Sequence, residues 1–186
     1  MSARGSILKF ANTQSQAAGI LASIQAGQLQ VWCIKLLSIV ADAYHLGVVI
    51  GKGGMVRAGT RTLLPDVLFV APTSCEEVES NSAPALAVEF VSSTMPERRR
   101  SELQQRYAQA GVQEYWQVEI ESAGPSFYQL NTQGRYDLIT PDKGGIYFSS
   151  HEELFFPALW FQQQPDLWTM MQYWGMIQDL PDENRD

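Results

Sequence analysis

The segment Ala85–Val91 constrains the fold most, because it is apolar on both of its alternating faces and still contains a carboxylate, Glu89. A strand that is apolar on both faces is covered on both sides, as in a sheet packed between helices. A carboxylate in such a strand costs several kcal/mol unless it is paired, protonated or bound to a metal ion. Glu89 is therefore a candidate functional residue.

Asp66 is the candidate partner of Glu89, 23 residues earlier in the chain. It lies at the start of a second predicted strand, Pro65–Val70, which is also apolar. If the two strands pair, both carboxylates converge at one edge of the sheet, where they repel each other unless a cation lies between them. Hard oxygen ligands select Mg²⁺ or Mn²⁺, which can activate water and neutralise the charge of a phosphodiester.

Each carboxylate also has a purely structural interpretation. Pro65-Asp66 at the start of a strand is a common turn dipeptide, and Glu89 could pair with an arginine of the helix that follows its strand. The two positions taken together favour a functional site, because buried carboxylates with shifted pKa values cluster at such sites.

The patterns along the rest of the chain predict a single domain, residues 1–186, of the α+β (mixed α/β) class. The first thirty residues give little signal. The predicted helices are Ala26–Tyr44, a helix from a Thr94–Glu97 capping box to Ala110, and Asp166–Leu180, whose Met and Trp residues we expect in the core or a subunit interface. The further predicted strands are a hairpin of Val48–Ile50 and Met55–Arg57, then Val112–Ile120, Ser126–Leu130, Tyr136–Ile139 and Ile146–Ser149.

The charge of the chain argues against strong binding to nucleic acid. The formal net charge is −7, whereas nucleic-acid-binding domains usually have a basic surface. Arg98, Arg99 and Arg100 form a local basic cluster. We therefore expect a local basic strip and a weak non-specific affinity for DNA.

The residues suited to other chemistries are few. Cys33 and Cys75 are too few for a disulfide framework or a zinc knuckle, so we expect reduced thiols and a cytoplasmic protein. His45 and His151 are the only histidines, which disfavours zinc hydrolases and Ser-His-Asp enzymes. We find no signal peptide and no apolar stretch of about eighteen residues, since Lys35 interrupts the longest, so no membrane association is expected.

Four segments together resemble the Uma-two family of restriction endonucleases, in the PD-(D/E)XK nuclease superfamily. They are Pro65–Val70, Val88–Ser92, Tyr107–Val112 and Glu114–Trp116. The similarity extends roughly over Val31–Trp160. The resemblance implies a restriction endonuclease-like fold, with a central mixed sheet flanked by helices and extra C-terminal strands.

The resemblance also implies roles for particular residues. Asp66 and Glu89 would be catalytic ligands of Mg²⁺ or Mn²⁺, with the backbone carbonyl of Phe90 as the third ligand, and DNA would be the substrate. Gln28 would lie near the histidine that many relatives have at the start of the first long helix. Relatives often dimerise, and the apolar C-terminal helix agrees with a homodimer.

The chain departs from the family at the catalytic lysine. The family has it at the position of Leu103, and the wider superfamily at the position of Val91. Neither side chain can polarise a water molecule. Arg99, one helical turn before Leu103, is a candidate substitute cation, although a solvated helix face also accounts for Arg98–Arg100.

A second departure lies upstream. Relatives have a glutamate near the position of Gln14–Gln16, and no acidic residue precedes Asp42 here. Two functions therefore stay open: a metal-dependent DNA endonuclease, and a catalytically degenerate relative that serves as a binding or interaction module. A glycosidase with paired carboxylates has no support beyond composition.

Overall fold

The structure, a computed structural model, describes residues 3–71, 83–151 and 153–178, with side chains from residue 19 onward. Its centre is a six-stranded sheet in the order β1-β4-β5-β6-β7-β8. β5 and β6 are parallel and the other neighbouring strands are antiparallel, so the sheet is mixed. Its strands are β1 (Val48–Ile50), β4 (Val67–Val70), β5 (Leu86–Val91), β6 (Glu114–Glu119), β7 (Gly124–Leu130) and β8 (Tyr136–Ile139).

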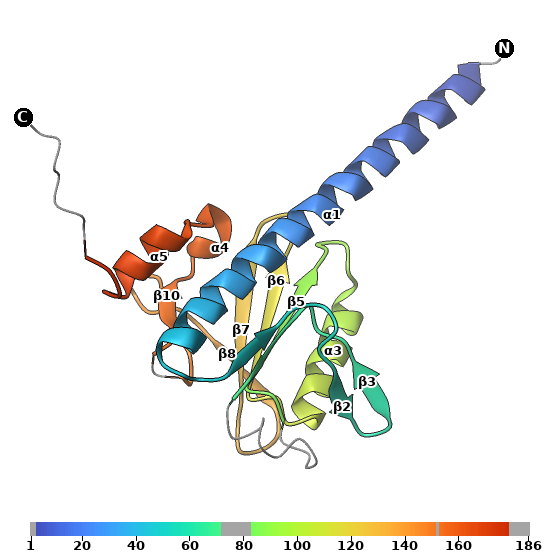
Figure 1. Ribbon diagram of the computed structural model, residues 1–186. Coiled ribbons are helices and arrows are strands. Elements are labelled where there is room, and N and C mark those ends of the chain that lie inside the picture. Colours follow the sequence, from blue (N-terminus) through green and yellow to red (C-terminus); the bar gives the residue numbers. More distant parts are fainter. Residues whose placement is uncertain (1–2, 72–82, 152, 179–186) are drawn as a thin grey trace, which may run out of the picture.

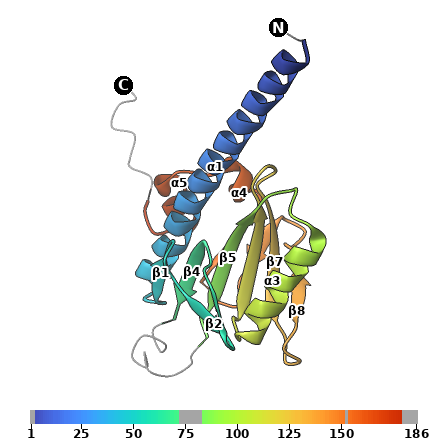
Figure 2. The ribbon, with the colours of Figure 1, turned by 90° about the vertical axis from the view of Figure 1, so that its right-hand side faces the viewer.

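Two helices cover the opposite faces of this sheet (Figures 1 and 2). The long helix α1 (Ala3–Ala43) packs Trp32, Leu36 and Val40 into the larger core cluster. The shorter α3 (Glu97–Gln109) packs Tyr107 into a second cluster on the other face. The sequence prediction of a mixed sheet flanked by helices is confirmed.

Alternation along β5 decides which side chains meet which helix. Leu86 and Val88 belong to the cluster under α1, whereas Ala87 belongs to the cluster under α3. Successive residues of a strand point to opposite faces. Glu89, two residues after Ala87, therefore points to the α3 face.

The smaller elements complete the two layers. The hairpin of β2 (Val56–Ala58) and β3 (Arg61–Leu63) adds Val56 and Leu63 to the cluster under α3. The larger cluster, under α1, receives buried side chains from the C-terminal elements. These elements are β9 (Ile146–Phe148), β10 (Phe155–Pro157), α4 (Trp160–Gln163) and α5 (Leu167–Tyr173).

The predicted hairpin of Val48–Ile50 with Met55–Arg57 is wrong. β1 pairs with β4, and β2 pairs with β3. The turn that joins β2 to β3 contains Gly59, whose φ of +61° suits a tight turn. The segment Gly51–Gly54 instead lies over β4, where a Cβ on Gly54 would come within 3.1 Å of Leu68.

The predicted capping box at Thr94 is also wrong. α3 begins after Pro96 without a side-chain cap, and Thr94 forms a hydrogen bond of 2.9 Å with Ser92 instead. The predicted end of this helix is confirmed, because Gly111 adopts a φ of +76° immediately after it.

The first helix is much longer than predicted, since α1 begins at Ala3 rather than Ala26. Ile20 and Ile24 are exposed. The part of α1 around them therefore has no buried face, and the sequence of the N-terminal half has no periodic apolar pattern that would predict a helix. Contrary to the expectation above, residues 19–43 are long and apolar enough to cross a membrane, with a mean hydropathy of 1.3. A core helix passes the same test, and 39% of that window is buried inside the protein.

The C-terminal helix is shorter than predicted within the described residues. α5 begins after Asp166, whose side chain accepts a hydrogen bond of 2.8 Å from the Thr169 N–H. Met170 and Trp174 are buried in the core as expected, whereas Trp168 is 46% exposed. β10 and α4 were not predicted, and the predicted loop Pro72–Ser82, with Cys75, lies outside the described residues.

Candidate active site

Asp66 and Glu89 lie next to each other across the boundary between β4 and β5. The register pairs Val67 with Val88, and the two carboxylates are the next residues beyond that pair. The Asp66 N–H donates to the Val88 carbonyl at 3.0 Å, and Asp66 Oδ2 accepts from the Phe90 N–H at 2.9 Å. The structure therefore brings together the two acids that the sequence singled out.

Glu89 is held from the α3 side by a tyrosine. The Tyr107 hydroxyl donates to Glu89 Oε1 at 2.5 Å. The Tyr107 ring stacks on Tyr115, with ring centroids 5.0 Å apart. This contact fixes one carboxylate oxygen and leaves the other available to a ligand.

The surroundings of Asp66 and Glu89 raise the pKa values of both carboxyl groups. Burial raises the pKa of Glu89 to about 7, and the negative charge of Asp66 adds to the rise, while the Tyr107 hydrogen bond opposes it. Burial also raises the pKa of Asp66, opposed by the Phe90 hydrogen bond and the charge of Lys52. A pair of partly buried acids with raised pKa values favours a bound cation or proton between them.

Lys52 is a site residue that the sequence analysis missed. β1 runs antiparallel to β4 with Ile50 opposite Leu68, so β1 ends near the start of β4, which Asp66 directly precedes. The positive charge of Lys52 lowers the pKa of Asp66, against the larger effect of burial, which raises it. The sequence feature that could have indicated it is a lone lysine in a glycine-rich segment. The sequence alone does not show which residue that lysine lies near.

Gln117 is the second residue that the sequence analysis missed. It lies directly opposite Glu89 in the parallel pair of β5 and β6, and it is only 6% exposed. Its side-chain oxygen has no hydrogen-bond partner in the part of the chain that the structure describes. A glutamine inside the apolar run Tyr115–Val118 was the available signal. We call Lys52, Asp66, Glu89 and Gln117 the polar row.

Two further predicted positions differ in how they relate to the acids. Phe90 contacts Asp66 through its N–H, and the carbonyl of a strand residue points to the same edge as its N–H. Arg99 is exposed and lines an open groove of about 430 Å³ with Leu103 and Arg106. Among the described residues, the groups acting on Asp66 and Glu89 are Phe90, Tyr107 and Lys52 rather than Arg99.

Glu89 does not pair with an arginine of α3, which was the structural interpretation of this residue. The arginine of α3 that turns toward the sheet, Arg100, donates to the Ser92 carbonyl at 3.0 Å and pairs with Glu119 at 3.2 Å. Glu89 is bonded to the Tyr107 hydroxyl instead. Its carboxylate therefore keeps a capacity for a cation that no described arginine takes up.

The oxygen atoms of Asp66, Glu89 and Gln117 suit a hard divalent cation. Within the described ranges, no group of three or more His, Cys, Asp or Glu side chains is placed to hold a metal ion. Two carboxylates with neutral oxygens and water are a ligand set that Mg²⁺ or Mn²⁺ accepts. The carbonyl of Phe90 and the side-chain oxygen of Gln117 are the neutral oxygens nearest in register.

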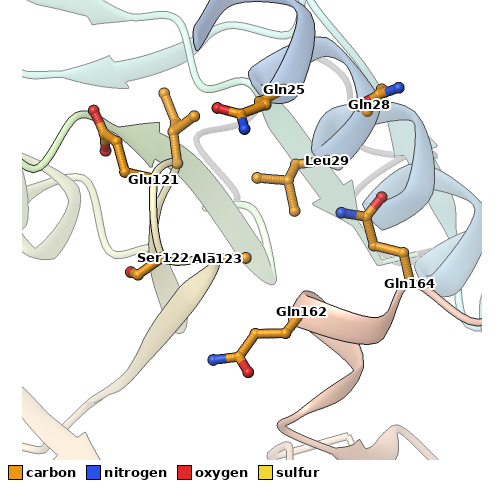
Figure 3. Close-up of a pocket in the computed structure, with 9 residues that line it drawn as sticks. Gln25, Gln28, Leu29, Glu121, Ser122, Ala123, Gln162 and Gln164 are labelled. Carbon is orange, nitrogen blue, oxygen red and sulfur yellow. The ribbon is translucent and has the colours of Figure 1, made fainter. Parts of the chain in front are cut away.

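Gln28 lies away from the carboxylates, in a separate pocket. Figure 3 shows this pocket between α1, the β6–β7 turn and α4, with glutamine amides on several sides. Its volume is about 450 Å³. The glutamine of α1 that reaches the site is Gln30, whose amide donates to the Asp66 backbone carbonyl at 2.7 Å. The side chains of Gln14–Gln16 lie outside the described residues.

A third buried carboxylate, Glu114, is structural. It is 1% exposed and accepts hydrogen bonds from Tyr147 Oη at 2.8 Å, from Ser149 Oγ at 2.8 Å and from the Ser150 N–H. These partners tie the β9 region to β6 on the α1 face. Glu114 is therefore saturated by donors, unlike the acids of the polar row.

Comparison with known proteins places the chain in a family. The sequence profile of the Uma2 family, described as "Putative restriction endonuclease", matches residues 11–162. The crystal structure of a "putative nuclease belonging to DUF820" from Anabaena variabilis superposes with a TM-score of 0.59 at 13% identity, over 75% of this chain and 81% of that chain. A search of curated proteins gave no match. The structural match shows a shared fold. The family match extends over most of the sequence, and the chain belongs to the Uma2 family.

Proposed function

We propose that this protein is a metal-dependent endonuclease that hydrolyses phosphodiester bonds in DNA. One observation carries the proposal: Asp66, just before β4, and Glu89, on β5, lie side by side on the face covered by α3, and the charge of Lys52 acts on Asp66. Membership of the Uma2 family supports the same chemistry.

The residues have separable roles in this proposal. Asp66 and Glu89 hold the ion, and the Phe90 carbonyl is the third ligand. When bound, Mg²⁺ or Mn²⁺ would neutralise phosphate charge and acidify a water molecule. Tyr107 holds the Glu89 carboxylate in place. Arg99 stays a candidate phosphate contact, at the edge of the groove along α3.

Lys52 takes the part of the lysine that is absent at Leu103 and Val91. Its ammonium group carries three donors, and Lys52 follows β1, which borders β4 on the side opposite to β5 and Glu89. It is exposed, so it can reach a phosphate that approaches Asp66. Its role is to hold and orient that phosphate, because a charged ammonium cannot accept a proton.

The surroundings of the site favour a polyanion despite the net charge of −7. Arg57 and Arg61 are exposed on the β2–β3 hairpin, which shares the α3 face with the site. Arg98 is also exposed, but Glu102 partly offsets its charge in an ion pair of 3.0 Å. We expect DNA binding to be weak and to fall steeply with salt.

Nicking of supercoiled plasmid at low salt with Mn²⁺ tests the function. We expect the wild type to nick and Asp66→Ala and Glu89→Ala to lose the activity, with Asp137→Ala, an exposed acid on β8, as a matched control. Nicking that survives Glu89→Ala would identify a contaminant and refute the proposal.

The absence of lysine at Leu103 favours a second candidate, a degenerate relative that binds without cutting. Leu103 packs, partly buried, against the cluster under α3. Leu103→Lys restores the family's residue. If the wild type binds Mn²⁺ but does not nick, and Leu103→Lys does not nick either, the interaction module is the better account.

A further inference from the structure

Gln117 is a buried polar side chain for which the fold of the described residues offers no explanation. It is only 6% exposed, in the middle of β6, and its Oε1 has no hydrogen-bond partner within residues 3–71, 83–151 and 153–178. Leaving a buried acceptor unpaired destabilises a protein, whereas an apolar side chain of the same size would not. The adjacent residues of β6, Trp116 and Val118, are apolar and buried.

The strand register places Gln117 next to an acid of the site. Glu89 is its register partner on β5, and Ser126 is its partner on β7. Two residues away on the same face, Glu119 is engaged by Arg100 at 3.2 Å. The Tyr115 hydroxyl, two residues away on the other side, is also buried without a described partner. Gln117 therefore extends the row of Asp66 and Glu89 by one strand.

We infer that the side-chain oxygen of Gln117 is a neutral ligand of the divalent cation held by Asp66 and Glu89. The inference rests on the cation site of the proposed function and adds a ligand to it. Side-chain amide oxygens are accepted ligands of hard divalent cations. A neutral ligand suits this position, because a third carboxylate beside Asp66 and Glu89 would add repulsion.

The position of Gln117 also defines what kind of ion the site favours. The side chains of Asp66, Glu89 and Gln117 offer oxygen atoms, and neither sulfur nor imidazole, as ligands. Such a set selects Mg²⁺, Mn²⁺ or Ca²⁺ over Zn²⁺. Burial of Gln117 further implies that its oxygen serves the ion rather than the nucleic acid, which cannot reach it.

The test is calorimetric titration of Mn²⁺ into the full chain, together with melting temperatures measured in EDTA. Gln117→Leu removes the oxygen and keeps most of the volume. We expect Mn²⁺ affinity to fall about tenfold or more, which corresponds to about 1.4 kcal/mol, while the melting temperature in EDTA stays equal or rises. Gln129→Leu, on the neighbouring strand and exposed, is the matched control and should bind like wild type.

A second variant keeps the inference testable if Gln117→Leu folds poorly. Gln117→Glu retains a ligating oxygen, so we expect Mn²⁺ affinity at or above the wild-type level and a lower melting temperature in EDTA. Unchanged Mn²⁺ affinity in Gln117→Leu, with binding that still requires Asp66, would overturn the Gln117 assignment and leave the cation site standing. Absence of Mn²⁺ binding in the wild type would overturn both.

Discussion

Glu89 is the residue whose environment has the clearest consequence in solution. Burial raises the pKa of Glu89 from its ordinary 4.5 to about 7. Between these two pH values the folded, metal-free protein keeps a proton on Glu89 that the unfolded chain has released. A raised pKa makes the folded state bind more protons, and the free energy of unfolding then falls as pH rises. The contribution of this bound proton to the free energy of unfolding is complete below about pH 4.5 and is lost by about pH 7.

We therefore predict a pH-dependent difference between the wild type and Glu89→Gln. In EDTA, the stability of the wild type relative to this variant should decrease by about 3 kcal/mol between pH 4.5 and 7.5. Urea unfolding at several pH values measures it. A difference that does not change with pH would contradict the buried, partly protonated Glu89.

Lys52 carries the second prediction at this scale. Lys52→Met should reduce Mn²⁺-dependent nicking by on the order of 100-fold, the cost of losing one charged group at a reacting phosphate. Mn²⁺ affinity should be unchanged or higher, because a positive charge beside Asp66 is removed. Lys35→Met, an exposed lysine on α1, is the control. Nicking at the wild-type rate in Lys52→Met would exclude Lys52 from the reaction.

The sequence showed the acids of this site but not their neighbours, for a physical reason. Asp66 and Glu89 stand out because carboxylates are costly in apolar strands. Lys52 and Gln117 join them only through strand register, which a single sequence does not specify. Arg99 was inferred from helical spacing alone, and the positive charge that acts on Asp66 is that of Lys52 instead.

Among the elements, the parallel pair β5–β6 organises the rest of the fold. Its α3 face carries Glu89 and Gln117, and its α1 face carries Trp116 and Glu114. The boundaries of these strands followed from apolar runs ended by glycine and polar residues. The pairing of β1 did not, because a Gly-Lys-Gly-Gly segment resembles a hairpin turn when the partner strand is unknown.

A substitution of Glu114, on β6, tests whether the two faces of this strand pair have separate roles. Glu114→Ala should lower the free energy of unfolding by about 3 kcal/mol, because Tyr147, Ser149 and Ser150 lose a shared buried acceptor. Mn²⁺ binding below the melting temperature should persist, since Glu114 faces α1 and the polar row faces α3. Gln113→Ala, one residue away and exposed, should be nearly neutral. Loss of Mn²⁺ binding with unchanged stability would contradict this division of faces.

For the whole molecule, the exposed apolar side chains on α1 and α5 bear on the predicted homodimer. Ile20 is 62% exposed, Ile24 53%, and Trp168 46%. We predict a dimer in light scattering at micromolar concentration, and a monomer for the double variant Ile20→Glu, Ile24→Glu. A monomeric wild type would refute the homodimer without affecting the cation site.

The binding of one divalent cation by Asp66 and Glu89 is the central claim, and melting temperature with and without Mn²⁺ tests it most directly. A cation present at about 100 times its dissociation constant stabilises the folded state by about 2.7 kcal/mol, which for a chain of this length raises the melting temperature by roughly 5–10 °C. We predict that rise in the wild type and in Asp137→Ala, and its absence in Asp66→Ala. No rise in the wild type, or an equal rise in Asp66→Ala, would contradict the account.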